Sequence, residues 1–281
     1  MLDSVIEFFQ SLRQNALMQH ALLAGLMAAL ACGVIGPYVV VRRIVSISGG
    51  IAHAVLGGMG IAYFFGRQPL LGALLAALVA ALIIGWVSLR YKQHEDTIIG
   101  ALWASGMAIG ILFMARTPGY AADLNTWLFG DVLFASPTDL ALIAALDCAI
   151  ILVVALLHRW FTAVCFDEEH ARLQGVWVDA VYLTLLCLIA LTVVTLIRVV
   201  GLILVIALLT LPSAIALHYV RSLGRVMIVA TLLGWVFAFS GLAVSYAPNL
   251  NTGASIVLIA ALTYLLSLAG RGLMRRRQGR N

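Results

Sequence analysis

Charged residues are scarce in this sequence, and their scarcity excludes a water-soluble fold. Only 10% of the 281 residues are charged, whereas a soluble domain carries about 25% charged residues and needs them on its water-facing surface. Hydrophobic residues make up 63% of the chain, and its mean hydropathy is +1.08. Apolar stretches of about 20 residues span a bilayer as helices, which satisfy their own backbone hydrogen bonds in lipid. The sequence therefore predicts an all-α, polytopic membrane protein.

Lysine is almost absent, which excludes ATP chemistry of the P-loop kind. The only lysine is Lys92, between Tyr91 and Gln93, whereas a P-loop requires Gly-Lys followed by Ser or Thr. The patterns HExxH and GxSxG are missing as well, so neither a zinc protease nor a serine hydrolase is indicated. We expect no enzyme, and any ATP hydrolysis that drives this chain must come from a separate subunit.

Cysteine is present but shows no ligand or disulfide spacing. Its four positions lie in or beside apolar segments without a CxxC or Cys/His pattern: Cys32, Cys148, Cys165 and Cys187. Buried free cysteine behaves as a small hydrophobic residue. We therefore expect no disulfide and no permanently bound metal or other cofactor.

Long apolar stretches, in contrast, occupy almost the whole chain. Nine segments qualify as spans: Ala16 to Val41, Ile51 to Phe65, Leu70 to Leu89, Ile98 to Ala115, Leu140 to Leu157, Ala180 to Ile197, Val199 to Leu217, Val226 to Ala247 and Ile256 to Ala269. The second and ninth are short for a crossing, and Arg198 alone separates the sixth from the seventh, so eight spans also fit. No soluble domain fits between them, and residues 1–281 are expected to form a single membrane domain.

The basic residues predict the orientation of this domain. In the nine-span arrangement, 13 of the 17 Lys and Arg residues fall on one side: Arg42, Arg43, Arg90, Lys92, Arg159, Arg172, Arg221, Arg225, Arg271, Arg275, Arg276, Arg277 and Arg280. The positive-inside rule makes that side cytoplasmic. We expect the N-terminus and the acidic loop with Asp123 outside, and the basic tail, residues 271–281, inside.

The first 15 residues have apolar side chains near helical spacing. Leu2, Val5, Phe9 and Leu12 recur in this way, which is typical of an amphipathic helix at the membrane surface. A frayed end fits the same pattern. We expect residues 1–15 to form an interfacial helix on the outer face.

The most informative polar residue within an apolar segment is a histidine. His53 lies in RRIVSISGGIAHAVLGGMGIAYFFG, which begins at Arg42. On a helix, Gly49, Gly57 and Gly60 share its face, so a neighbouring backbone could approach closely while the imidazole points into an interface or a pore. An ionisable residue at membrane depth indicates function. A hydrogen bond from His53 to a backbone carbonyl in a packed helix pair is the alternative, and position alone does not decide between them.

Five stretches together resemble the ABC-3 family of zinc, manganese and iron permeases. They are RRIVSISGGIAHAVLGG from Arg42, EDTIIGALWASGMAIGILF from Glu95, ADLNTWLFGDVL from Ala122, FDEEHARLQGV from Phe166 and VGLILVIALLTLPSAIAL from Val200. They follow the family's order and cover most of the chain. The resemblance implies a type II ABC importer-like fold and transport of zinc, manganese or iron across the bacterial inner membrane, with His53 as a transient ligand.

The resemblance also implies partners. These are two copies of a cytoplasmic ABC ATPase, a periplasmic or lipid-anchored metal-binding protein and a second copy of this chain, within membrane lipid and without nucleic acid. Two positions depart from the family. Gly49 stands where an aspartate usually shares the ion with the histidine, and Gln174 stands where a leucine is usual.

The cytoplasmic loop, residues 159–177, contains the segment that the family uses to dock on its ATPase. By resemblance this coupling segment runs from Phe166 to Gly175. Asp167 can cap a short helix, Glu168 and Glu169 occupy its first turn, and Arg172 comes later, which suits the helix dipole. A solvated loop helix without a partner is the alternative that the residues alone allow.

Two further residues within spans carry no firm assignment. Pro212 removes a backbone donor from the seventh span and must kink or break its helix, as a static bend or as a gating hinge. Asp147 is an acidic residue inside the fifth span, where it could pair with a hydroxyl or a histidine, but the sequence names no partner.

Three other classes of function compete with a metal permease. A secondary transporter would show inverted repeats and coupled ionisable groups near the midplane, and no repeat is visible in this sequence. An ABC importer for a metal chelate or cobalamin has similar coupling loops but generally a longer chain. A membrane scaffold without transport is weakly disfavoured by His53. Ligand type does not choose among zinc, manganese and iron.

Overall fold

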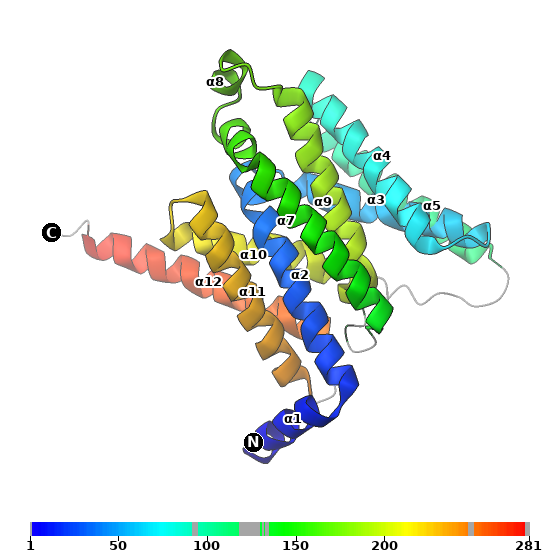
Figure 1. The fold of residues 1–281 in the computed structure, drawn as a ribbon, viewed down its shortest axis with the longest axis vertical. Coiled ribbons are helices and arrows are strands. Elements are labelled where there is room, and N and C mark those ends of the chain that lie inside the picture. The colour runs from blue at the N-terminus through cyan, green and yellow to red at the C-terminus, as the bar shows by residue number, and fades with distance from the viewer. Residues whose placement is uncertain are drawn as a thin grey trace.

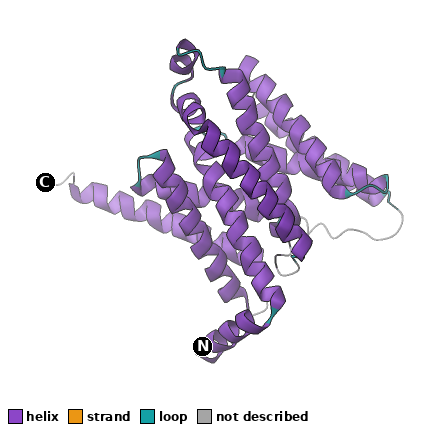
Figure 2. Cartoon of the chain, in the orientation of Figure 1, coloured by secondary structure: helices purple, strands orange, loops and turns teal. Residues whose placement is uncertain are grey.

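The computed structural model describes residues 2–91, 95–117, 130, 132, 135–246 and 250–278. Within this part of the chain, nine helices are long and apolar enough to cross a membrane. They are α2 (Ala16–Val41), α3 (Val45–Phe64), α4 (Pro69–Arg90), α5 (Glu95–Ala115), α7 (Pro137–Phe166), α9 (Val178–Val200), α10 (Leu202–Tyr219), α11 (Leu223–Tyr246) and α12 (Thr252–Gln278). Two short helices, α1 (Leu2–Gln14) and α8 (Glu168–Leu173), are also present in the described residues. The all-α prediction and the count of nine, rather than eight, are confirmed (Figure 2).

Some sequence predictions lie outside the described residues. These are the loop position Asp123, the only lysine, Lys92, and the last three residues of the basic tail. Most of the stretch that begins at Ala122 falls there too.

Three groups of helices make up the bundle. Helices α3, α4 and α5 pack on one another at one side, whereas α10, α11 and α12 pack together at the other (Figure 1). Helices α2 and α9 lie between them and contact both groups, and α7 packs on α2 and α9. The short helix α8 lies at one end of the bundle and α1 at the opposite end (Figure 1).

Two predicted span boundaries were wrong, for local backbone reasons. Helix α3 begins at Val45, ahead of the predicted Ile51, because the Ser48 hydroxyl donates to the Val45 carbonyl at 2.7 Å and does not interrupt the helix. Helix α9 continues past Arg198 and ends at Gly201, whose φ of 81° lies in the left-handed region. Glycine adopts this conformation without a Cβ clash, so it marks the helix end where the charge does not.

Helix α7 is longer than predicted, which shortens the coupling loop. A capping box starts it: the Ser136 hydroxyl accepts from the Asp139 amide at 3.2 Å, and the Asp139 carboxylate accepts from the Ser136 amide at 3.2 Å. The helix then runs to Phe166. Residues 159–166, predicted as loop, are therefore the last two turns of α7.

Glycine allows the closest helix contacts. A Cβ added at Gly57 would lie 2.8 Å from the carbonyl oxygen of Gly106, and one at Gly60 would lie 2.7 Å from that of Gly110. On the other side of α3, a Cβ at Gly58 would lie 2.2 Å from the carbonyl oxygen of Gly72. Helix α3 therefore touches α4 and α5 backbone to backbone, and close approach of this kind holds membrane helices together by dispersion contacts.

The N-terminal helix α1 packs against α11. Phe8 is buried, with its ring centroid 5.9 Å from that of Phe239 and 5.8 Å from that of Tyr246. Ser11 and Tyr246 share a hydroxyl hydrogen bond of 2.5 Å. A helix thus forms over the predicted residues, while its position at the membrane surface stays a prediction.

Candidate functional site

His53 lies in the middle of α3 and faces α5. Its imidazole stacks on the indole of Trp103, with ring centroids 4.0 Å apart and planes 15° apart. The side chain is only 8% exposed, and within the described residues its Nδ1 atom is buried without a hydrogen-bond partner. The backbone hydrogen bond that the sequence offered as the alternative is therefore missing at Nδ1, and this nitrogen is available for another ligand.

Gly49 lies one helical turn before His53, beneath the same indole. A Cβ added there would lie 3.3 Å from Cζ3 of Trp103, closer than most real Cβ contacts. Trp103 thus covers the space that a side chain at position 49 would enter. A carboxylate at this position would have to displace the indole by a few tenths of an ångström or more.

The glycine face of α3 is used within the chain. Gly57 and Gly60, which the sequence placed on the face of His53, contact the backbone of α5. They provide the close packing that was expected, and lining of a pore by these glycines stays a prediction. Over the residues that the structure describes, no three His, Cys, Asp or Glu side chains lie together where a metal ion could bind.

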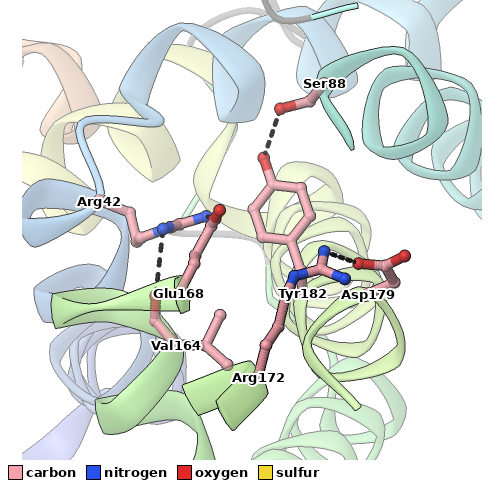
Figure 3. A network of polar contacts seen from close by, with 7 residues as sticks. All are labelled: Arg42, Ser88, Val164, Glu168, Arg172, Asp179 and Tyr182. Carbon is pink, nitrogen blue, oxygen red and sulfur yellow. Dashed lines mark hydrogen bonds and ion pairs between the residues drawn. The ribbon is translucent and has the colours of Figure 1, made fainter. Parts of the chain in front are cut away.

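The coupling segment has the predicted cap at its start. The Asp167 carboxylate accepts from the His170 amide at 2.9 Å and begins α8. Gly175 ends the segment with a φ of 80°, a conformation that favours glycine. Arg172 forms an ion pair with Asp179 at the start of α9, so α8 is fixed at both ends (Figure 3).

The two glutamates of the first turn of α8 differ in direction. Glu168 is half-buried in an ion pair with Arg42, at the end of α2, whereas Glu169 is exposed. Two apolar side chains near α8 are also strongly exposed: Leu173 is 87% exposed and Trp177 is 82% exposed. Phe166 is exposed as well.

Several residues around these two sites were not singled out from the sequence. Arg42 was counted only as a topological charge, although the basic pair opens the stretch that carries the resemblance. The sequence did not identify Trp103, Tyr182 or Ser88 as functional, because an aromatic or hydroxyl residue in an apolar span is most often a packing residue. Their contacts are between helices far apart in sequence, which single-segment patterns do not reveal.

Pro212 and Asp147 lie in the helical core. Pro212 is buried within α10, which continues through it as a helix. Asp147 is 4% exposed on α7, and within the described residues neither carboxylate oxygen has a hydrogen-bond partner. Burying an unpaired carboxylate is costly, and the hydroxyl or histidine partner considered from the sequence is not found in this part of the chain.

Comparison with known sequences places the whole chain in one family. Residues 14–271 match the ABC 3 transport family. The chain is 48% identical over 268 residues to an uncharacterised membrane protein of Synechocystis sp., which covers 95% of either sequence. It is 33% identical over 260 residues to the manganese transport system membrane protein MntC of Halalkalibacterium halodurans, covering 92% of this chain and 89% of MntC.

A solved structure has the same fold. PsaBC from Streptococcus pneumoniae, determined in complex with a Fab, superposes with a TM-score of 0.84 at 30% sequence identity. The match covers 94% of this chain and 95% of that one. The similarity therefore extends over every helix group and is not confined to the stretches around His53 and α8.

Proposed function

We propose how this chain, which belongs to the ABC 3 transport family and is the permease subunit of a metal importer, passes its cargo. The ion moves past His53, whose neutral imidazole serves as a transient ligand through Nδ1. The observation that carries this proposal is the buried Nδ1 atom without a partner among the described residues. A metal ligand must be deprotonated and unengaged when the ion arrives, and a site that conducts must also release the ion readily.

Manganese is the first candidate for the cargo. One relative that this chain covers almost completely is named a manganese transport protein. Imidazole nitrogen suits zinc and iron better than manganese, which prefers oxygen ligands, so the name of the relative and not His53 favours manganese. A single protein nitrogen leaves most coordination positions to water, and with glycine at position 49 in place of a carboxylate the ion is held more weakly.

The transporter needs partners that this chain does not contain. We infer a separate ATPase, since Lys92 is the only lysine and stands outside any P-loop, and a metal-binding protein that delivers the ion from outside. A second copy of the chain completes the path, in the bacterial inner membrane. The 13 basic residues on one side of the nine spans support a cytoplasmic C-terminus.

Docking of the ATPase is assigned to the exposed apolar side chains around α8. Leu173, Phe166 and Trp177 project from the short helix and its flanks, and fully desolvated apolar anchors dominate binding energy in protein interfaces. Glu169 lies beside them and can add charge complementarity. Glu168 is not part of this exposed surface, because its carboxylate is half-buried in the ion pair with Arg42.

The test of this function is metal uptake by a His53 variant. Cells lacking their own importers, and expressing this chain with its ATPase and binding protein, should accumulate radiolabelled manganese. His53→Ala should reduce the uptake rate about tenfold or more, as expected for loss of an interaction worth at least 1.4 kcal/mol. His53→Gln should not restore it, because an amide binds metal poorly.

The matched control is another histidine that is already engaged. His158 accepts or donates a hydrogen bond of 2.7 Å with the Tyr38 hydroxyl, and His158→Gln can keep that bond, so uptake should stay near normal. Normal uptake by His53→Ala would mean that the ion does not pass His53. Parallel measurements with radiolabelled zinc and iron decide which metal is carried.

A further inference from the structure

The α2–α3 junction, residues Arg42 to Ile44, has an unusual backbone. Arg43 has a φ of 60° and is the one residue other than glycine with a positive φ in the described part of the chain. The Ile44 amide donates to the Val39 carbonyl at 3.0 Å and the Arg43 amide to the Val40 carbonyl at 3.2 Å. This is a Schellman arrangement, in which the left-handed position is usually glycine. A strained non-glycine residue held by its surroundings indicates a functional constraint.

Arg42 makes polar contacts with three other helices from this junction (Figure 3). Its guanidinium pairs with Glu168 of α8 and donates to the carbonyl of Val164 in α7 at 3.1 Å. It also lies over the ring of Tyr182 in α9, 5.1 Å from the centroid. The Tyr182 hydroxyl shares a hydrogen bond of 3.1 Å with Ser88 in α4. One side chain therefore connects the short helix α8 to the start of α3.

The contacts of Arg42 are directional and surround an open space. Arg42, Glu168, Tyr182 and Ser88 line a cavity of about 360 Å³ that also reaches Arg43. The Arg42 and Glu168 side chains are 18% and 21% exposed, so water screens their attraction less than at an open surface. The planar guanidinium fixes both direction and register when it binds several acceptors at once.

We propose that Arg42 is a positioning residue that transmits movement of α8 to α3, and through α3 to His53. A displacement of α8 pulls on Glu168, and the ion pair carries this to the α2–α3 junction. The left-handed Arg43 is the point at which α3 can change direction relative to α2. This inference rests on the proposed function, because it assumes that an ATPase moves α8.

The experiment measures ATP hydrolysis and manganese uptake together. The full chain, its ATPase and its binding protein are reconstituted in proteoliposomes, and uptake per ATP hydrolysed is compared among variants. Arg42→Gln and Glu168→Gln should keep ATPase binding and hydrolysis near normal, while uptake per ATP falls about tenfold, since each removes a charge-assisted hydrogen bond. In Arg42→Lys, uptake per ATP should fall less, because lysine keeps the positive charge but lacks the planar guanidinium that can bind two acceptors.

Two controls and one rescue separate this role from a structural one. Exposed residues away from the junction and from α8 provide the controls, Arg90→Gln on α4 and Glu7→Gln on α1, and both should keep uptake per ATP near normal. The exchange of charges in Arg42→Glu with Glu168→Arg should restore part of the loss. If Arg42→Gln does not fold, uptake per ATP is compared between Arg42→Lys and the unaltered protein instead.

The outcomes distinguish the inference from the proposed function. Normal uptake per ATP in both Arg42→Gln and Glu168→Gln overturns the inference and leaves the proposed function intact. Parallel loss of ATPase binding and uptake also overturns it, because Arg42 would then only hold α8 for docking. If the unaltered complex hydrolyses ATP without ATP-dependent uptake of manganese, zinc or iron, the proposed function fails, and the inference fails with it.

Discussion

Two contact regions of this permease are built in opposite ways. Helices α3 and α5 meet where side chains are absent, with Gly57 against Gly106 and Gly60 against Gly110. Helix α8 meets the rest of the protein through long charged side chains, Arg42 to Glu168 and Arg172 to Asp179. The first contact depends on shape and the second on charge and direction. An added methyl group should damage the first, and removal of a charge or of an exposed anchor should damage the second.

The largest effect on stability is expected at the glycine contact. A Cβ in Gly106→Ala would lie 2.6 Å from the Cα of Ala54 and 2.9 Å from the carbonyl oxygen of His53, so the helices must separate. Overpacking of this kind costs about 1–3 kcal/mol, and the melting temperature of the purified protein in detergent should fall. Gly100→Ala, on the same helix with no atom within 4 Å of its Cβ, should leave it unchanged or raise it. Equal melting of the two variants would contradict a backbone contact at Gly106.

A smaller effect, on binding only, is expected at the exposed side of α8. Leu173→Asp places a charge on a residue that is 87% exposed in the free chain, so the protein should fold and melt normally. The affinity for the ATPase should fall about tenfold, since burial of an uncompensated charge at an interface costs more than 1 kcal/mol. The affinity can be measured by titration in detergent. Leu250→Asp, 55% exposed before α12, serves as the control, and equal affinities for the two variants would place docking elsewhere.

The smallest effect is expected within the polar contacts around Arg42. Tyr182→Phe removes a hydroxyl hydrogen bond of 3.1 Å to Ser88 but keeps the ring beneath the guanidinium. One neutral hydrogen bond contributes about 1 kcal/mol, and uptake per ATP should change less than twofold if Arg42 is the transmitting group. Tyr182→Ala, which also removes the ring, is the comparison. If uptake per ATP falls as much in Tyr182→Phe as in Arg42→Gln, the Tyr182 hydroxyl rather than the Arg42 guanidinium transmits the movement.

Periodicity and charge were sufficient to predict the helices but not their partners. The nine spans follow from apolar runs of sufficient length, and the cap at Asp167 follows from its position before Glu168 and Glu169. The stacking of His53 on Trp103, in contrast, joins residues fifty positions apart on two helices with similar composition. No property of either segment alone specifies that pair.

The errors in prediction share a cause. Hydropathy placed the start of α3 at Ile51 because Ser46 and Ser48 are polar, although a serine hydroxyl can bond within its own helix. Charge placed a helix boundary at Arg198, whereas the backbone ends the helix at Gly201. Likewise, the sequence placed Glu168 and Glu169 together in the first turn of α8 and did not predict the ion pair of Glu168, because its partner Arg42 is distant in sequence.

The backbone contact between α3 and α5 restricts how these two helices can move relative to each other. Sliding one helix along the other would drive Gly106 into the backbone of Ala54, so His53 and Trp103 are carried on a common frame. The indole of Trp103 is 41% exposed although it stacks on His53, and side-chain torsions of exposed residues relax within nanoseconds. If the ion passes His53 as proposed, we expect the path to open by movement of α3 and α5 as one unit, which is slower than the rotation of a side chain.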